Sequence, residues 1–378
     1  MITNKTNNIT IISTTIRNFE EQWKQFAENI SHYNHSNIKL LVCDDRHNIR
    51  HEEYLKKYDI PFKVIDKNIQ IDFFKKIFGS NFAKYSEIIK YDPSYKQMGF
   101  LIAAQDSDII INIDDDVFPK GDFIGGHSIV NKNIEIEEVS SNKNWFNTCH
   151  IMKNNQNRII YPRGYPYSKR KESYKYSLNK GNVVLNMGLW SGIPDLDAIT
   201  FLQEDSGEMN GITDIRNTEL IKDRLMIAKG TYLPLCVMNI GFSKKILPAY
   251  YQTLQSVDVK GWQLARYDDI WSGVFVKKVI DSIGDKVTVG LPLVKHEKTP
   301  RDIFEDIKKE FIGILVSQKL YERIAEIDIN ARDYFDGYSQ LISGLREKEI
   351  YHDVEIQKYF EKLFDYMELW LQIVEKIM

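Results

Sequence analysis

Strand-like and helix-like segments alternate over the first third of the sequence, and this alternation restricts the fold more than any other feature. The strand-like segments are short apolar runs at residues 8–13, 38–43, 61–66 and 109–113. Runs that are apolar throughout predict strands buried on both faces, as in a mostly parallel sheet covered by helices. The sequence therefore predicts an α/β fold whose ligand lies beyond the carboxyl ends of the strands.

Helical periodicity separates these runs and dominates the end of the chain. Phe19, Trp23 and Phe26 recur on one face of an expected helix at residues 17–30, and a second helix is expected at 94–104. Residues 145–300 are richer in loops. From about residue 302 the pattern is helical, and its apolar stripe is typical of core packing.

The length of 378 residues allows one large or two ordinary domains. We predict a catalytic domain at residues 1–301 and a helical extension at 302–378 that packs on it, with self-association through the helices as a possible use of this extension.

Charge, cysteine content and hydropathy exclude several classes of protein. The net charge of -3 gives no support to nucleic-acid binding, which favours a basic surface. Three widely spaced cysteines indicate neither a disulfide framework nor a zinc site. No signal peptide and no apolar run of about 18 residues is recognisable, so we expect a cytoplasmic protein without a membrane span.

Three adjacent carboxylates, Asp114, Asp115 and Asp116, follow directly on the apolar run 109–113. Such side chains repel one another and do not belong in a packed core without compensation. Asp114 and Asp116 alternate on an extended segment, so they can converge on one divalent cation, and Mg²⁺ or Mn²⁺ prefers such oxygen ligands. The simpler alternative is a solvated turn before Pro119.

Further acidic and imidazole side chains follow other predicted elements. Asp44 and Asp45 come after the run 38–43, which places them at the same expected edge of the sheet as the triplet. His296 follows a late apolar strand and is a candidate third metal ligand. Two pairs of aspartates lie in GLWSGIPDLDA and RYDDIWSG, namely Asp195, Asp197, Asp268 and Asp269.

An arginine lies in an unusually stiff segment, YPRGYPYSKR, at residues 161–170. Arg163 stands between Pro162 and Gly164, and Arg170 follows seven residues later. Prolines and a glycine predict a shaped loop rather than a regular element. Judged by its chemistry alone, Arg163 would contact a phosphate, because guanidinium binds anions through two parallel hydrogen bonds.

Several segments together resemble the reversibly glycosylated polypeptides, a family that includes the UDP-arabinopyranose mutases of plants. The matching segments occur in the family's order: TTIRNFEEQW, NIDDDVFP, YPRGYPYSKR, GLWSGIPDLDA, KGTYLPLCVMNIGF, ARYDDIWSG and GLPLVKHEK. They extend from about residue 9 to 311.

This resemblance implies a type-A nucleotide-diphospho-sugar transferase fold that binds a UDP-sugar with Mn²⁺ or Mg²⁺. It implies metal binding by Asp114, Asp116 and His296. Nucleotide contacts are expected from Thr15, Arg17, Asp44, Asp45, Lys96, Asp114 and Asp115. Arg163 matches the arginine that becomes reversibly glycosylated, and Arg170 matches a second arginine that the family's activity requires.

Glycosylation of an arginine needs a base, because the protonated guanidinium is a poor nucleophile. Asp195, Asp197, Asp268 and Asp269 are all candidates, and the sequence does not choose among them. Two other functions stay open. The protein is then either a glycosyltransferase that passes the sugar to an external acceptor, such as a surface polysaccharide, or a non-catalytic subunit that binds nucleotide sugars.

Overall fold

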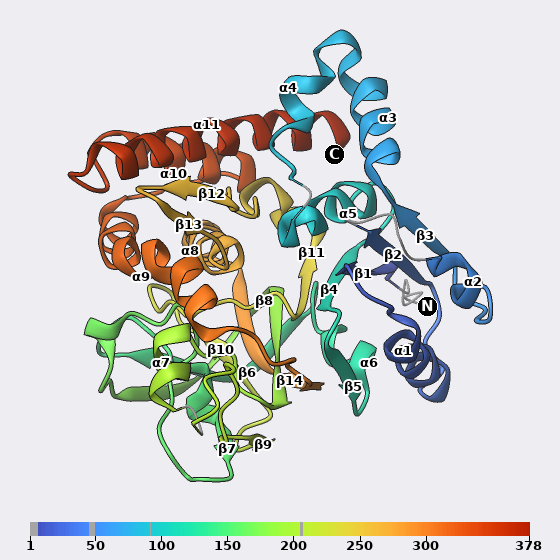
Figure 1. Ribbon diagram of the computed structural model, residues 1–378, viewed down its shortest axis with the longest axis horizontal. Coiled ribbons are helices and arrows are strands. Elements are labelled where there is room, and N and C mark those ends of the chain that lie inside the picture. Colours follow the sequence, from blue (N-terminus) through green and yellow to red (C-terminus); the bar gives the residue numbers. More distant parts are fainter. Residues whose placement is uncertain (1–6, 45–49, 91, 205–206) are drawn as a thin grey trace.

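The computed structural model describes residues 7–44, 50–90, 92–204 and 207–378. Its N-terminal half is a parallel sheet in the order β3-β2-β1-β4, with helices packed on it (Figure 1). The strands are β1 (Ile9–Thr15), β2 (Ile38–Asp44), β3 (Phe62–Ile65) and β4 (Ile109–Asp114). The helices are α1 (Glu20–His32), α2 (His51–Leu55), α3 (Lys67–Phe78), α4 (Phe82–Ser86) and α5 (Lys96–Ala103).

The central strands of this half are buried on both faces, as their apolar composition predicts. In β4, Ile109, Ile110, Ile111 and Ile113 have no exposed surface. The observed strands begin and end within two residues of the predicted ones, and β1 continues to Thr15. The predicted α/β class is confirmed.

The second half of the sheet is mixed. From β4 the order continues β11-β8-β6-β10-β14-β5, and β4–β11, β11–β8 and β14–β5 are antiparallel pairs. Its strands are β5 (Val117–Lys120), β6 (Asn133–Ser141), β8 (Tyr174–Gly192), β10 (Arg224–Ile227), β11 (Asn239–Ser243) and β14 (Lys286–His296). Short strands β7 (Met152–Asn154) and β9 (Asn217–Leu220) pair at its margin, and β12 (Val257–Val259) and β13 (Trp262–Leu264) form a separate hairpin.

Helices α6 (Phe123–His127), α7 (Ala198–Gln203) and α8 (Asp268–Ile283) accompany this half. The C-terminal region is helical, as predicted, and consists of α9 (Ile303–Glu326), α10 (Tyr334–Arg346) and α11 (Val354–Ile377) (Figure 1). This arrangement, a Rossmann-like parallel half joined to a mixed half and followed by helices, agrees with the type-A transferase fold that the sequence predicts.

The C-terminal helices share one hydrophobic core with the rest of the chain. Trp370 of α11 is fully buried, and its indole nitrogen donates a hydrogen bond of 2.8 Å to the carbonyl of Leu247. Tyr359 similarly donates to the carbonyl of Leu254 at 2.7 Å. The division at residues 301 and 302 stays a prediction, and α9 contributes to the main pocket described below.

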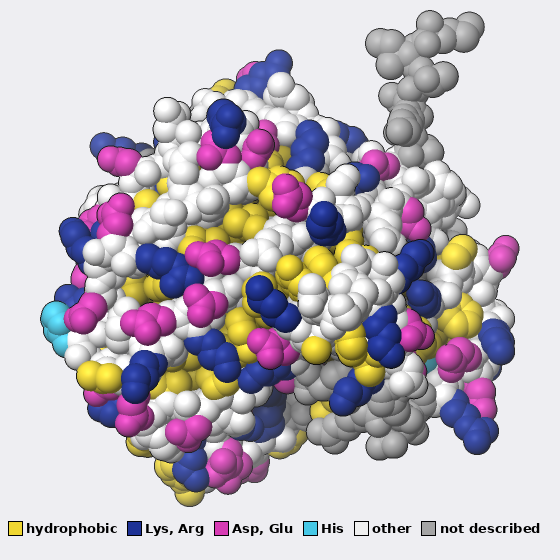
Figure 2. All heavy atoms as spheres, turned by 90° about the horizontal axis from the view of Figure 1, so that it is seen from above, with side chains coloured by type: hydrophobic (Ala, Val, Ile, Leu, Met, Phe, Trp, Pro, Cys, Tyr) yellow, Lys and Arg dark blue, Asp and Glu magenta, His cyan; other side chains and the backbone are white. Residues whose placement is uncertain are grey.

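The face of the molecule next to α11 and α4 carries charges of both signs in close mixture (Figure 2). Seen from the side of α11 and α4, basic and acidic side chains alternate with apolar ones and neither sign forms a continuous patch (Figure 2). Over the described ranges, none of the helices combines the length and the apolar character that a membrane crossing requires.

Candidate active site

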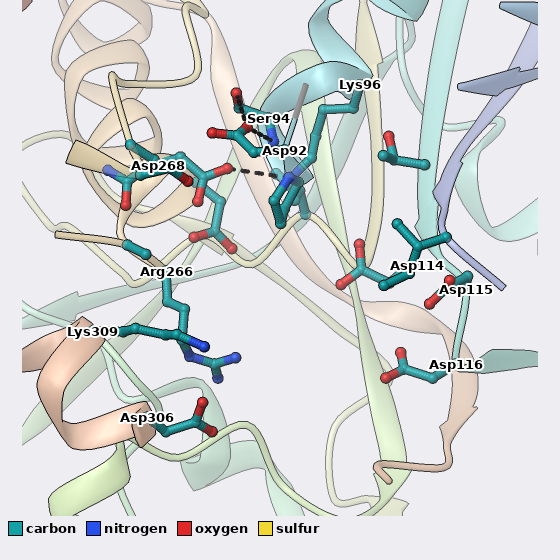
Figure 3. Close-up of a pocket in the computed structure, with 18 of the residues that line it drawn as sticks. Asp92, Ser94, Lys96, Asp114, Asp115, Asp116, Arg266, Asp268, Asp306 and Lys309 are labelled. Atoms are coloured by element: carbon teal, nitrogen blue, oxygen red, sulfur yellow. Dashed lines mark hydrogen bonds and ion pairs between the residues drawn. The ribbon is translucent and has the colours of Figure 1, made fainter. Parts of the chain in front are cut away.

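A polar pocket of about 720 Å³ opens beyond the carboxyl ends of β1 and β4. Its wall combines the acidic triplet, the start of α5, Arg163, the start of α8 and the start of α9. Asp114 and Asp116 lie on one side of the cavity, and Arg266 and Lys309 lie on the opposite side (Figure 3). We call the side with Asp114 and Asp116 the acidic wall, and the side with Arg266 and Lys309, where Asp306 also lies, the basic wall (Figure 3).

The acidic triplet forms the tight turn between β4 and β5. Gln22 of α1 fixes this turn, because its amide nitrogen donates to the carbonyls of Asp114 at 2.7 Å and Val117 at 2.5 Å. Asp114 and Asp116 point into the cavity (Figure 3). Asp115 is instead engaged by Arg17 at 2.9 Å and by the hydroxyl of Thr15 at 2.8 Å.

Burial of these carboxylates leaves their charge poorly compensated. Burial raises the pKa of Asp114 to about 7, with Asp116 and Asp269 adding to the shift and Lys96 opposing it. Burial also raises the pKa of Asp115, against the effect of Arg17. A cation in the cavity would relieve this repulsion.

His296 approaches the triplet from the end of β14. Its Nδ1 donates to the carbonyl of Ile193 at 2.7 Å, which leaves Nε2 facing Asp116 Oδ2 at 3.7 Å. Burial alone would raise the pKa of Asp116, but the contact with His296 lowers it below its ordinary value. A backbone partner on the other nitrogen is the usual support of a metal-bound histidine.

The donors of the predicted metal site fit Mn²⁺ or Mg²⁺ in their chemistry: the carboxylates of Asp114 and Asp116 line the cavity, and the imidazole of His296 faces Asp116. Within the described parts of the chain, no three acidic, histidine or cysteine side chains already stand at metal-binding distances. Metal binding by Asp114, Asp116 and His296 therefore stays a prediction.

Lys96 and Asp268 form a buried ion pair of 3.4 Å between α5 and α8. Burial raises the pKa of Asp268, while Lys96 opposes this shift. Both residues line the pocket. Lys96 also interacts electrostatically with Asp114, so its positive charge partly balances the acidic wall.

Arg163 is held between two carboxylates at the base of the pocket. Asp195 contacts Nε at 3.3 Å and Nη2 at 3.1 Å, and Asp269 contacts Nη1 and Nη2 at 3.2 Å each. The carbonyl of Arg266 accepts a further hydrogen bond from Nη1. Although burial opposes it, these carboxylates raise the pKa of Arg163 far above its ordinary value.

The loop backbone explains why a glycine follows this arginine. Gly164 has a φ of +82°, and a Cβ there would lie 2.3 Å from Ile270 Cγ2. Neither the dihedral angle nor the space suits another residue. The loop can therefore pack against α8 and bring Arg163 to Asp269.

The structure separates the four aspartates that the sequence leaves open as bases. Asp195 and Asp269 touch Arg163, whereas Asp268 pairs with Lys96. Asp197 caps α7 through a hydrogen bond from the Thr200 amide at 2.9 Å. Asp195 and Asp269 are thus the two that contact the arginine directly.

Arg170 lies outside the pocket lining and stabilises the loop instead. Its guanidinium carbon lies 3.9 Å from the ring centroid of Tyr167 and 4.8 Å from that of Tyr161. Asp197 is 3.8 Å away. This geometry indicates a positioning residue rather than one that touches a ligand in the pocket.

Two of the predicted nucleotide contacts lie apart from the pocket lining. Asp44 is buried at the end of β2, 3.5 Å from His51 Nε2. The hydroxyl of Thr15 donates a hydrogen bond to Asp115. Asp45, also predicted, lies outside the described residues. Arg17, Lys96, Asp114 and Asp115 do line the cavity.

The basic wall consists of residues that the sequence analysis did not single out. Arg266, Arg301 and Lys309 line the pocket, and buried Glu310 holds Arg266 Nε at 2.6 Å. Burial and the nearby charge of Arg266 lower the pKa of Arg301.

These features define the class: an α/β protein with a polar pocket, lined by carboxylates and basic side chains, at the carboxyl edge of a Rossmann-like half-sheet. Comparison with known families agrees with this description. The profile of the family called "Reversibly glycosylated polypeptide" matches residues 5–378. The chain therefore belongs to the reversibly glycosylated polypeptide family.

Named relatives cover nearly the whole chain. "Probable UDP-arabinopyranose mutase 4" of Arabidopsis thaliana is 28% identical, over 97% of this chain and 90% of the relative. "UDP-arabinopyranose mutase 1" of the same plant is 27% identical, over 97% and 92%. "Probable UDP-arabinopyranose mutase 1" of Pisum sativum is 28% identical, over 97% and 90%.

Solved structures show a weaker likeness. Glucosyl-3-phosphoglycerate synthase from Mycobacterium tuberculosis, in complex with Mn²⁺, UDP and glucosyl-3-phosphoglycerate, aligns with a TM-score of 0.37. The identity is 12%, over 82% of this chain and 80% of that one.

Proposed function

We propose that the protein is an enzyme that binds a UDP-sugar and a divalent cation in this pocket and transfers the sugar reversibly to its own Arg163. In this proposal it interconverts pyranose and furanose forms of the UDP-sugar, in line with the names of its relatives. The observation that carries the proposal is the position of Arg163, a buried arginine in the wall of the pocket that also contains the acidic triplet.

The two facing walls suit a nucleoside diphosphate. A cation held by Asp114, Asp116 and His296 would neutralise the diphosphate and favour its departure. On the other side, Arg301 and Lys309 offer positive charge to the same phosphates. The sugar then extends towards Arg163, which also lines the pocket.

The covalent step exchanges one bond at the anomeric carbon for another. An Arg163 nitrogen forms the new bond to this carbon while the bond to the UDP oxygen breaks, and UDP leaves with the electron pair. The guanidinium gives up one proton, and Asp269 or Asp195 is placed to accept it. Because these carboxylates also stabilise the protonated arginine, proton loss must accompany bond formation rather than precede it.

Ring interconversion follows from the nitrogen link. The ring oxygen leaves the anomeric carbon with its electron pair and takes up a proton, so that an iminium-like open form remains. A different hydroxyl then closes the ring and loses its proton. In the final step, UDP recaptures the anomeric carbon, and Arg163 regains its proton from the carboxylate.

The direct test is the intact mass of the full chain after incubation with Mn²⁺ and a panel of UDP-sugars. We expect a mass increase of one sugar residue with at least one donor, reversed by added UDP. Arg163→Ala and Arg163→Lys should lack this increase. Arg158→Ala, which changes an exposed arginine shortly before this segment, should keep it.

Circular dichroism and UDP binding identify variants that have lost their fold. An adduct that persists in Arg163→Ala would contradict the proposal. So would transfer to an added acceptor without any adduct, which would support the glycosyltransferase alternative. UDP binding without adduct or turnover would support the non-catalytic alternative.

A further inference from the structure

A second, smaller hollow of about 350 Å³ lies beside the main pocket. It is formed by the hairpin β12–β13 and the first turns of α9, which pack against each other. Gln263 and Lys309 line both the hollow and the main pocket, so the two spaces are neighbours. Apart from Lys309, the proposed reaction assigns no role to the residues of this hollow.

Trp262 forms its aromatic wall and is unusually exposed for a tryptophan. Its relative exposure is 36%, while the other large residues of the hairpin, Val259 and Leu264, are buried. Phe311 of α9 packs against the indole, with ring centroids 4.6 Å apart. Phe311 supports one side of the ring, so the indole presents a rigid apolar surface to solvent. A ligand that binds there would restrict little further side-chain motion.

The polar side chains around the indole balance in charge. Two carboxylates, Asp258 and Glu305, stand with two ammonium groups, Lys308 and Lys309. Glu305 pairs with Lys308 at 2.6 Å, and Asp258 accepts from the Gly261 amide at 3.0 Å. Carboxylates and ammonium groups are thus equal in number, so this hollow has no excess of positive charge with which to attract a phosphate.

Gln263 adds an amide that can both donate and accept, so donors and acceptors of every kind surround one apolar plane. A ligand that matches this surface has an apolar face edged by neutral hydroxyl groups. Sugar rings have this chemistry: their C–H groups pack on an aromatic face while their hydroxyls bond to carboxylates, amides and ammonium groups.

We propose that the hollow at Trp262 binds a neutral saccharide next to the nucleotide-sugar pocket. This inference rests on the proposed function, because only that function makes the neighbouring pocket a site for an activated sugar. The binding itself needs neither nucleotide nor Arg163.

The experiment measures saccharide binding to the full chain by saturation-transfer NMR and calorimetry, without nucleotide. The probes are neutral hexasaccharides: xylohexaose, arabinohexaose, cellohexaose and maltohexaose. We expect at least one to bind, Trp262→Phe to keep this affinity, and Trp262→Ala to weaken it by about tenfold or more.

Phe304→Ala is the matched control. Phe304 is an exposed aromatic residue of α9, the helix beside the hollow, but it does not line the hollow. It should bind as the unchanged protein does. No binding of any probe at millimolar concentration, or equal affinity in Trp262→Ala, would overturn the proposal. Adduct formation on Arg163 is measured separately, so a failure of either proposal can be recognised without the other.

Discussion

Asp116 stands between His296 and the open cavity, and its role can be tested by one substitution. Asp116→Asn keeps the size of the side chain and removes the charge that a cation would need. We expect UDP affinity in Mn²⁺ to fall by at least about tenfold, because a charged ligand is lost. Isothermal calorimetry with Mn²⁺ and with EDTA measures this effect.

In the unchanged protein EDTA should weaken UDP binding, whereas in Asp116→Asn it should change little further. If UDP bound the unchanged protein equally well with EDTA, the metal assignment would be wrong. Burial of the triplet would then need another source of compensation, such as Lys96 and Arg17.

Arg170 provides a second test at the level of single residues. Its guanidinium is stacked on Tyr167 and Tyr161, so Arg170→Ala should lower the free energy of unfolding by about 1–2 kcal/mol. Chemical denaturation measures the loss. Arg170→Lys should recover only part of the stability, because an ammonium lacks the planar stack. UDP affinity should stay close to normal, and a loss as large as in Asp116→Asn would place Arg170 in the pocket.

Among the elements, α6 carries a histidine whose surroundings force one protonation state. His127 is fully buried, and its Nε2 donates to Asn239 Oδ1 at 2.9 Å while Nδ1 accepts from the Asn186 amide at 3.1 Å. Burial lowers the pKa of His127 to about 3. A proton on Nδ1 would also face the Asn186 amide, which is itself a donor.

This environment predicts acid sensitivity of the fold. Below the unfolded pKa of about 6.5 only the unfolded chain takes up this proton, so stability falls as the pH drops from about 6.5 towards 3. The loss attributable to His127 is about 1.4 kcal/mol per pH unit, or about 2 kcal/mol at pH 5.

Urea denaturation at pH 7 and pH 5 should show this extra loss in the unchanged protein and not in His127→Gln. His352, which is fully exposed, gives the control, and His352→Gln should keep the full pH dependence. Identical pH dependence in all three proteins would show that His127 does not control it.

Comparison between elements also explains what the sequence could predict. β1, β2 and β4 were predictable because strands buried on both faces are apolar throughout. The place of the acidic triplet followed from β4, since side chains after parallel strands meet at one edge. The Arg163 clamp was not predictable, because Asp195 and Asp269 reach it from loops and a helix distant in sequence. The basic wall was missed since α9 reads as an ordinary amphipathic helix, with nothing in its periodicity to show that Lys309 faces a pocket.

At the scale of the whole molecule, the C-terminal helices belong to the same core as the sheet, and α9 adds Lys309 and Glu310 to the site. A chain truncated after residue 301 should therefore lose cooperative thermal unfolding and UDP binding. Differential scanning calorimetry and UDP titration test this expectation. A truncated chain that unfolded cooperatively and bound UDP normally would show that residues 1–301 are an independent domain.

The pocket draws its wall from residues as far apart in the sequence as Thr14 in β1 and Lys309 in α9. A growing polypeptide thus has no complete binding site until most of its length has left the ribosome. A nucleotide sugar can stabilise only chains in which these distant segments have already come together, because a ligand stabilises only the state that contains its binding site. Ligand supply would then influence how much finished protein survives, and not how quickly the sheet begins to form.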